Sequence, residues 1–134
     1  MKYLDINQIL TIYDEVIKQT GGSKGIRDIR LLESAVARPR ATFAKKELYP
    51  DVFSKATALG HSIILNHPFI DGNKRTGYMV MRLFLNVNGY DVKASLEEKY
   101  KFVMGIAKKT IKEESISKWL KEHSRKIMNL PTLI

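Results

Sequence analysis

Apolar residues recur at the spacing of an α-helix along most of the chain, and the first two stretches have clear boundaries. The first stretch follows Asp5, which can cap a helix, and is stopped by Gly21 and Gly22. The second follows Asp28 and ends at Pro39. The expected inward positions are Ile6, Ile9, Leu10, Tyr13, Val16 and Ile17 in the first helix, and Ile29, Leu32, Ala35 and Val36 in the second.

Two further apolar stretches flank a polar loop in the middle of the chain. The stretch before the loop has helical spacing at Val52, Phe53, Ala56, Leu59, Ile63 and Ile64. The stretch after it runs from Tyr78 to Val87, which is too long for an ordinary strand, and is ended by Gly89. We therefore predict helix, tight loop, helix, with His67-Pro68 closing the first helix because a residue before proline is driven out of the α region.

The last third of the chain predicts two more helices. Ser95 is placed to cap one of them and Ser115 to cap the other. The expected inward positions are Leu96, Tyr100, Val103, Met104 and Ala107 in the first, and Ile116, Trp119, Leu120, His123 and Ile127 in the second. The tail from Asn129 to Ile134 is apolar, and we expect it to pack back onto the fold or to contact a partner.

The loop between the two central helices carries the candidate chemistry. Residues 67–77 read His-Pro-Phe-Ile-Asp-Gly-Asn-Lys-Arg-Thr-Gly, which combines a titratable base, an acid, a flexible glycine and two adjacent cations. Gly72-Asn73 can adopt the left-handed conformations that a nest of backbone N–H groups requires. A helix that begins near Lys74 directs its positive end at anything bound over Gly72. The pattern therefore indicates a phosphate site.

Each part of a phosphoryl-transfer site has a candidate residue in this loop. The base that removes a proton from an attacking hydroxyl would be His67, and the magnesium ligand would be Asp71, the nearest carboxylate. The donors to the phosphate oxygens would be the backbone and side chains of Gly72, Asn73, Lys74 and Arg75. Taken singly, these residues have ordinary interpretations as a helix cap, a turn and a solvated helix face, but together at this spacing they favour a site. The loop is not a Walker A motif, because Asn73 follows Gly72 where lysine would be required.

The stretch HPFIDGNKR, residues 67–75, resembles the signature of the Fic/Doc superfamily, HxFx(D/E)GNxRxxR. The resemblance is to the death-on-curing (Doc) branch, because Lys74 stands where AMP-transferring Fic enzymes carry a second glycine. Tyr78 also replaces the final arginine of the long Fic pattern. Residues 25–39 read like the GxRDxxLLESAxxRP stretch common in that branch, so the resemblance extends to about Gly89.

The resemblance implies an all-α fold, a compact Fic/Doc-type bundle of about six helices that forms a single domain over residues 1–134. In Fic-like folds, the segment before the motif helix forms a flap, often a short hairpin, that lines up the target peptide. The stretch from Ala41 to Tyr49 has no clear period, and we place the flap there.

The resemblance also implies a reaction. In Fic AMP-transferases, the second glycine leaves room for the β-phosphate of ATP, and a hydroxyl attacks the α-phosphate. A lysine fills that space, and Doc-like enzymes are thought to bind the nucleotide reversed, presenting the γ-phosphate. The implied protein is a toxin of a toxin–antitoxin pair, which phosphorylates a threonine of elongation factor Tu, halts translation and is neutralised by its antitoxin. By this resemblance, His67 takes the hydroxyl proton, Asp71 holds Mg²⁺, and residues 72–75 bind the phosphates of ATP.

Other functions stay open at the sequence level. One is still an enzyme, a Fic-type AMP-transferase or a transferase with another phosphate-bearing donor. Another is a non-catalytic basic helical module that binds protein or nucleic acid, although such a module has no need of His67 and Asp71 together. His61, His67 and Asp71 are poor candidates for a zinc site, because a proline-terminated helix end separates the histidines.

Composition sets outer limits on these interpretations. A chain of 134 residues is long enough for one domain with a core, and no apolar run is long enough to cross a membrane. The amphipathic, acid-containing start does not read as a signal peptide, and the lack of cysteine fits a cytoplasmic protein. The net charge of +9 permits an acidic protein partner or a nucleic acid, but without an RNA-binding aromatic motif we expect no direct nucleic-acid contact.

One segment has the spacing of an inhibitory motif. Self-inhibited Fic proteins carry a Ser/Thr-x-x-x-Glu-Gly/Asn helix, and Thr110 to Glu114 matches its first part, but Ser115 follows. We interpret the match as coincidence, although it is the best internal candidate.

Overall fold

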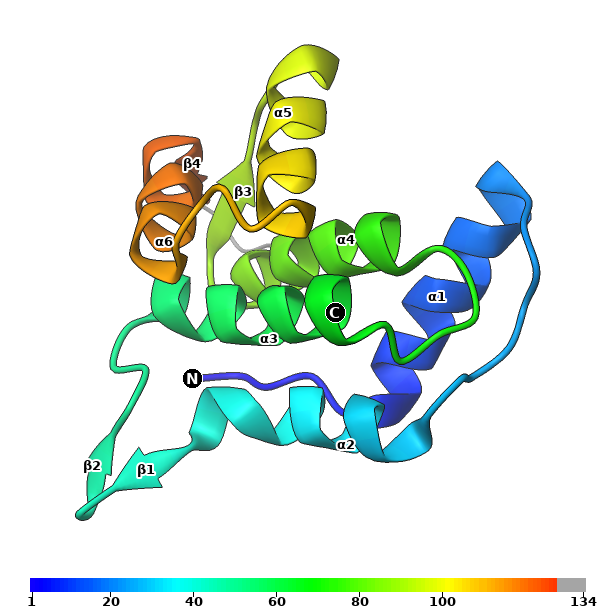
Figure 1. Cartoon of the computed structure of the whole chain (residues 1–134). Helices are drawn as coiled ribbons and strands as arrows, with labels where there is room; N and C mark the ends of the chain where they lie inside the picture. The colour runs from blue at the N-terminus through cyan, green and yellow to red at the C-terminus, as the bar shows by residue number, and fades with distance from the viewer. Residues whose placement is uncertain (128–134) are drawn as a thin grey trace, which may run out of the picture.

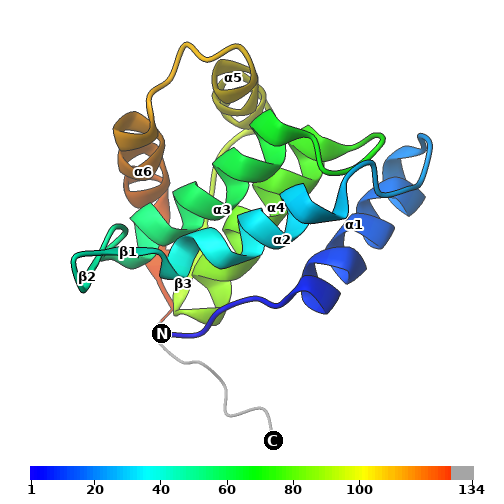
Figure 2. The same cartoon turned by 60° about the horizontal axis from the view of Figure 1, so that its bottom comes forward.

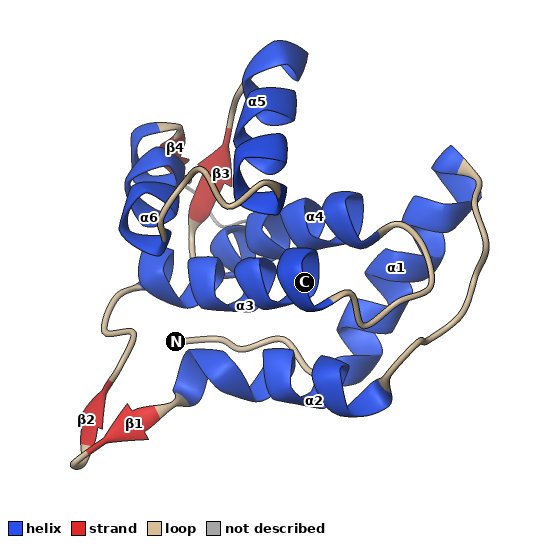
Figure 3. Cartoon of the chain, in the orientation of Figure 1, coloured by secondary structure: helices blue, strands red, loops and turns tan. Residues whose placement is uncertain are grey.

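Six α-helices make up most of the protein in the computed structural model, which describes residues 1–127 (Figure 1). The helices are α1 (Ile6–Thr20), α2 (Ile29–Ala37), α3 (Val52–Asn66), α4 (Asn73–Val87), α5 (Leu96–Ala107) and α6 (Glu113–Glu122), and a 3₁₀ helix, η1, covers Arg38–Arg40. The strands are β1 (Thr42–Phe43), β2 (Lys46–Glu47), β3 (Tyr90–Val92) and β4 (Ser124–Lys126), and they form two small antiparallel sheets. Figure 3 shows how little of the described chain is strand. The expected helical bundle of about six helices is confirmed.

Helix α1 begins and ends where the sequence predicts, whereas α2 begins as predicted but ends at Ala37, before Pro39, which lies in the 3₁₀ helix η1. Asp5 caps α1 in a capping box with Gln8, and Gly21 ends the helix with its N–H bonded to the carbonyl of Ile17. Asp28 caps α2 by accepting the N–H of Arg30. The expected inward position of Ile29 is wrong: this first residue of α2 is 46% exposed, because it lies at the helix end before the core-facing stripe begins.

Helices α3 and α4 form the central pair and lie side by side in both views (Figures 1 and 2). Asp51 caps α3 by accepting the N–H groups of Phe53 and Ser54. A Cβ added to Gly60 would lie 2.2 Å from Cγ of Met81 and 3.0 Å from the carbonyl oxygen of Gly77, so the two helices pack closely where glycine has no side chain. The buried side chains that α3 and α4 contribute to the core are Val52, Ala56, Leu59, Ile63, Ile64, Tyr78, Val80, Met81, Phe84 and Leu85.

The segment predicted to hold the flap forms a short hairpin of β1 and β2. Lys55, a buried lysine of α3, holds the hairpin by donating to a carboxylate oxygen of Glu47 (2.8 Å) and to the carbonyl of Pro39 (3.0 Å). In Figures 1 and 2, the hairpin lies at the start of α3, whereas the motif loop follows the end of that helix. A target that contacted both would therefore extend along α3.

The inward face predicted for α5 is correct only in part: Val103 and Ala107 pack against the core, but the first two predicted positions do not. Leu96 and Tyr100 are 84% and 67% exposed, whereas Phe102 and Ile106 are buried. Phe102 stacks on Trp119 of α6, with ring centroids 3.8 Å apart. Helix α5 has two apolar faces, and stacking against α6 decides which of them is buried.

Helix α6 is shorter than predicted and starts earlier. It begins at Glu113, so Ser115 lies in its first turn and is not its cap. It ends at Glu122, and the chain then forms β4, which pairs with β3 through Tyr90↔Lys126 and its neighbours. Ile127 therefore lies outside the helix. Its backbone N–H donates to the carbonyl of Gly89, next to β3, instead of to a carbonyl within α6. Ile116 and Leu120 are buried as expected.

Two other expectations concern this end of the chain. Thr110 lies in the turn before α6, so Thr110 to Glu114 does not form one helical motif. This agrees with our interpretation that the match to the inhibitory motif is a coincidence. The apolar tail from Asn129 onward lies outside the described residues. Across residues 1–127, no helix combines the length and the apolar character needed to span a bilayer.

Candidate functional site

The motif loop connects the end of α3 to the start of α4. Helix α3 ends at Asn66, and His67 follows in the left-handed conformation with φ 51° and ψ 60°. As predicted, the residue before Pro68 leaves the right-handed α region and closes α3, and the turn that it forms is left-handed. Gly72, also left-handed with φ 77°, precedes the first residue of α4.

The interior of the loop is fixed by Phe69 and Asn73. The Phe69 side chain is fully buried and stacks on Tyr13 of α1, with ring centroids 3.9 Å apart. The Asn73 side-chain amide bonds to both backbone groups of Phe69, accepting from its N–H (3.0 Å) and donating to its carbonyl (2.9 Å). The Asn73 side chain is thus engaged inside the loop, and its backbone N–H is the group that the first turn of α4 presents toward the pocket.

The upstream segment Gly25–Asp28 supports the loop from outside. The N–H of Ile70 donates to the carbonyl of Gly25 (2.9 Å), and the N–H groups of Arg27 and Asp28 donate to the carbonyl of Pro68 (2.7 and 3.1 Å). The Tyr13 hydroxyl in turn accepts from the N–H of Gly25 (2.7 Å). The two stretches that resemble the family pattern, residues 25–39 and 67–75, are therefore hydrogen-bonded to each other in the fold.

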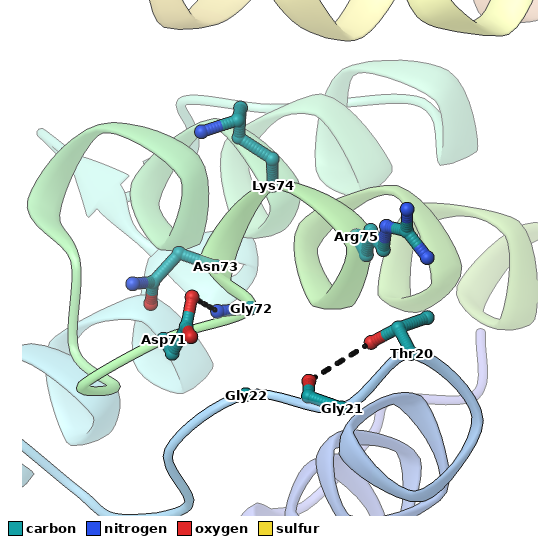
Figure 4. Close-up of a pocket in the computed structure, with 8 residues that line it drawn as sticks. All are labelled: Thr20, Gly21, Gly22, Asp71, Gly72, Asn73, Lys74 and Arg75. Carbon is teal, nitrogen blue, oxygen red and sulfur yellow. Dashed lines mark hydrogen bonds between the residues drawn. The ribbon is translucent and has the colours of Figure 1, made fainter.

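A pocket of about 280 Å³ opens between the motif loop and the end of α1 (Figure 4). Its lining residues are Thr20, Gly21, Gly22, Asp71, Gly72, Asn73, Lys74 and Arg75. The structure therefore brings together five of the six predicted site residues. From the sequence, Gly21 and Gly22 were assigned only to the end of α1 and not to the opposite wall of this pocket. The available signal was that two glycines follow the helix, where one is enough to end it.

Asp71 approaches Gly22 closely, and its carboxylate is held by backbone groups from both walls of the pocket. One oxygen accepts the N–H of Gly72 (2.9 Å), and the other accepts the N–H of Ser23 (3.3 Å). A Cβ on Gly22 would lie 2.6 Å from that second oxygen, so the close approach requires glycine. The exposed carboxylate keeps free lone pairs toward the pocket, and it fits Mg²⁺, which commonly takes one or two carboxylates and fills its other positions with phosphate and water.

The start of α4 is the positive end of the pocket. The N-cap residue of α4 is Gly72, which offers no side-chain cap, whereas Asp or Ser side chains cap α1, α2, α3 and α5. The N–H groups of Asn73, Lys74 and Arg75 belong to the first turn, which has no acceptor within the helix. An uncapped first turn that faces a pocket is an arrangement suited to an anion.

Two cationic side chains extend from this first turn. Lys74 and Arg75 are exposed and form no ion pair with any side chain in residues 1–127. In Figure 4, Lys74 points away from Gly21 and Gly22, whereas Arg75 lies on the side of Thr20. The two cations therefore reach different parts of a bound ligand.

His67 is exposed at the end of α3 and does not line the pocket. Within the described part of the chain, its imidazole has no hydrogen-bond partner, and only its backbone carbonyl is bonded. It can therefore meet a second reactant that approaches the pocket from outside. No group of three His, Asp or Glu side chains in residues 1–127 is arranged to hold a metal ion, so the zinc alternative with His61 and His67 is not supported.

His61 belongs to a different cluster. Its Nδ1 lies 3.1 Å from Nη1 of Arg38 and 3.7 Å from a carboxylate oxygen of Glu113. Burial lowers the pKa of His61 and the Arg38 guanidinium lowers it further, while Glu113 opposes the shift. Because the guanidinium can only donate, Nδ1 accepts and the ring is neutral in this arrangement.

Comparison with known proteins gives consistent matches. A family profile described as "Fic/DOC family" matches residues 3–85. "Toxin Doc" of Mycolicibacterium smegmatis (strain ATCC 700084 / mc(2)155) is 40% identical over 96 residues, which are 72% of this chain and 72% of that protein. "Protein kinase doc" of Escherichia phage P1 is 29% identical over 92 residues, which are 69% of this chain and 72% of that protein.

Proposed function

The chain belongs to the Fic/DOC family, and we propose that it is a Doc-type toxin that transfers the γ-phosphate of ATP to a hydroxyl group of a protein. The observation that carries the proposal is the uncapped first turn of α4, with Asp71 around the same pocket as Lys74 and Arg75, two cations that form no ion pair within residues 1–127. The names of two relatives, "Toxin Doc" and "Protein kinase doc", support the toxin and kinase parts.

ATP binds through its phosphates at the start of α4. The backbone N–H groups of the first turn and the side chains of Lys74 and Arg75 donate to the phosphate oxygens. Asp71 holds Mg²⁺, which when bound neutralises phosphate charge. A pocket of about 280 Å³ accommodates phosphates, while the rest of the nucleotide extends over the surface.

His67 acts as the general base. It accepts the proton of the target hydroxyl as the hydroxyl oxygen forms a bond to the γ-phosphorus, and the bond to the β-phosphate oxygen breaks to release ADP. Its exposed position suits a base that must meet the hydroxyl of another protein.

Lys74 decides which phosphate is transferred. Its stem fills the space that a glycine would leave for a β-phosphate in the AMP-transferring orientation, and its compact ammonium favours the reversed nucleotide. We further propose that the target is a threonine of elongation factor Tu, that the modification halts translation, and that an antitoxin protein neutralises the toxin.

The test compares two histidine variants. Purified protein is incubated with elongation factor Tu and γ-labelled ATP, and the label in the factor is counted. His67→Ala should reduce transfer by about 10²–10⁴-fold with an unchanged circular dichroism spectrum. His123→Ala should remain active, because His123 pairs with Glu98 away from the pocket. Undiminished transfer by His67→Ala would refute the role of the base.

A further inference from the structure

The side chain of Arg27 closes the end of α3. Its Nε donates to the carbonyl oxygen of His67 (2.6 Å) and its Nη2 to that of Asn66 (2.7 Å). Its own backbone N–H donates to the carbonyl of Pro68 (2.7 Å). One residue from the upstream segment thus bonds three consecutive carbonyls, the middle one belonging to the proposed base.

These carbonyls lie in an unfavourable place for an anion. The last carbonyl groups of a helix accept no hydrogen bond from within the helix, and they form the negative end of the helix dipole. Here, only residues 67–72 separate the negative end of α3 from the positive end of α4, where phosphate is proposed to bind. The Arg27 guanidinium donates to two of these oxygens, and its positive charge offsets the negative end of α3.

The same bonds fix the backbone of His67. A residue with a Cβ in the left-handed region costs on the order of 1 kcal/mol or more and persists only where its surroundings impose it. A histidine base is usually oriented by a partner on its second ring nitrogen, but within residues 1–127 this imidazole has none. Its direction therefore depends on the backbone that Arg27 holds.

We propose that Arg27 is a positioning residue for His67. The catalytic part of this inference rests on the proposed function. Arg27 touches no reacting atom; it holds the left-handed turn from which His67 meets the target hydroxyl.

The kinetic test compares two neighbouring arginines. Arg27→Met keeps the apolar stem and removes the donors, and Arg30→Met is the matched control, since the Arg30 side chain is 88% exposed. Arg27→Met should lower kcat by about 10–100-fold through misplacement of His67, with the KM for ATP changed much less. Arg27→Lys, which can bond one carbonyl, should recover part of the loss. A raised KM for ATP with unchanged kcat would instead make Arg27 a direct phosphate ligand and overturn the proposal. An equal fall of kcat in Arg30→Met would also overturn it.

A second measurement does not depend on the reaction. In Arg27→Met, amide hydrogen exchange should accelerate by about tenfold or more at Ile70, whose N–H bonds to Gly25, and remain unchanged at Leu59 in the buried middle of α3. Unchanged exchange at Ile70, or an equal rise over the whole chain, would overturn the positioning role. If wild-type protein transfers no label to elongation factor Tu, the proposed function fails, and this exchange experiment still decides whether Arg27 holds the loop.

Discussion

Replacing Gly22 by alanine adds one methyl group where the end of α1 faces Asp71. The new Cβ would lie 2.6 Å from the Asp71 carboxylate oxygen that accepts the N–H of Ser23. Gly22 also has φ 113°, a conformation that residues with a side chain rarely adopt. Gly21 is a matched control, because it has φ 74° and lines the same pocket, but a Cβ there meets nothing within 4 Å.

Both substitutions strain the backbone, and only one displaces the carboxylate. Strain of this kind costs about 1–3 kcal/mol. With an unfolding entropy of about 2.1 cal/mol/K per residue over 134 residues, either variant should lower Tm by about 4–11 °C. In Gly22→Ala, the carboxylate must also turn away from the N–H groups of Ser23 and Gly72. Loss of such partners typically weakens metal binding by about 10–100-fold.

The assay is a magnesium titration of phosphoryl transfer. Gly22→Ala should require about 10–100-fold more Mg²⁺ for half-maximal rate, and Gly21→Ala should match wild type once both are assayed well below their Tm. The reasoning about Asp71 is refuted if the two alanine variants have the same magnesium requirement, or if transfer does not depend on a divalent cation.

Three other predictions test separate parts of the account. Lys74→Gly should reduce γ-phosphoryl transfer by about 10–100-fold, because an ammonium–phosphate contact is lost; an unchanged rate with γ-labelled ATP would exclude that contact. Burial lowers the pKa of His61, so the folded protein binds fewer protons than the unfolded chain, and urea-unfolding stability should fall on acidification through the ordinary histidine pKa of 6.5. His61→Gln should lose this part of the pH dependence, and an identical pH profile would contradict the assignment. Gly60→Ala should lower the free energy of unfolding by about 1–3 kcal/mol, because its Cβ would lie 2.2 Å from Cγ of Met81 and 3.0 Å from the carbonyl oxygen of Gly77, and kcat should be retained at low temperature. An unchanged Tm would show that α3 and α4 can move apart at this contact without loss of stability.

Local signals in the sequence predicted most helix boundaries. Asp5, Asp28 and Ser95 cap helices as expected, because a side-chain cap is formed by residues three or fewer positions away. The β3–β4 pairing could not be predicted in this way, since it joins Tyr90 to Lys126 and depends on the folded chain. The buried face of α5 was predicted only in part for a similar reason, because both of its faces carry apolar residues.

The same distinction applies to the residues of the candidate site. Residue types and spacing predicted that Asp71, Lys74 and Arg75 share a pocket, because they lie within five residues of each other. The inward turn of the Asn73 amide is a bond to Phe69, four residues away in the same loop, whereas the contribution of Gly22 depends on a tertiary contact with Asp71. Hydrophobic periodicity reports neither of them. The positions of the hairpin and of Arg27 relative to the loop likewise follow only from the folded structure.

The most direct test of phosphoryl transfer at this site uses the wild-type protein, elongation factor Tu, and ATP labelled at either the γ- or the α-phosphate. If the start of α4 presents the γ-phosphate to the target hydroxyl, label from γ-labelled ATP remains on the factor after denaturation, and label from α-labelled ATP does not. Retention of the α-label instead would contradict the account and identify AMP transfer.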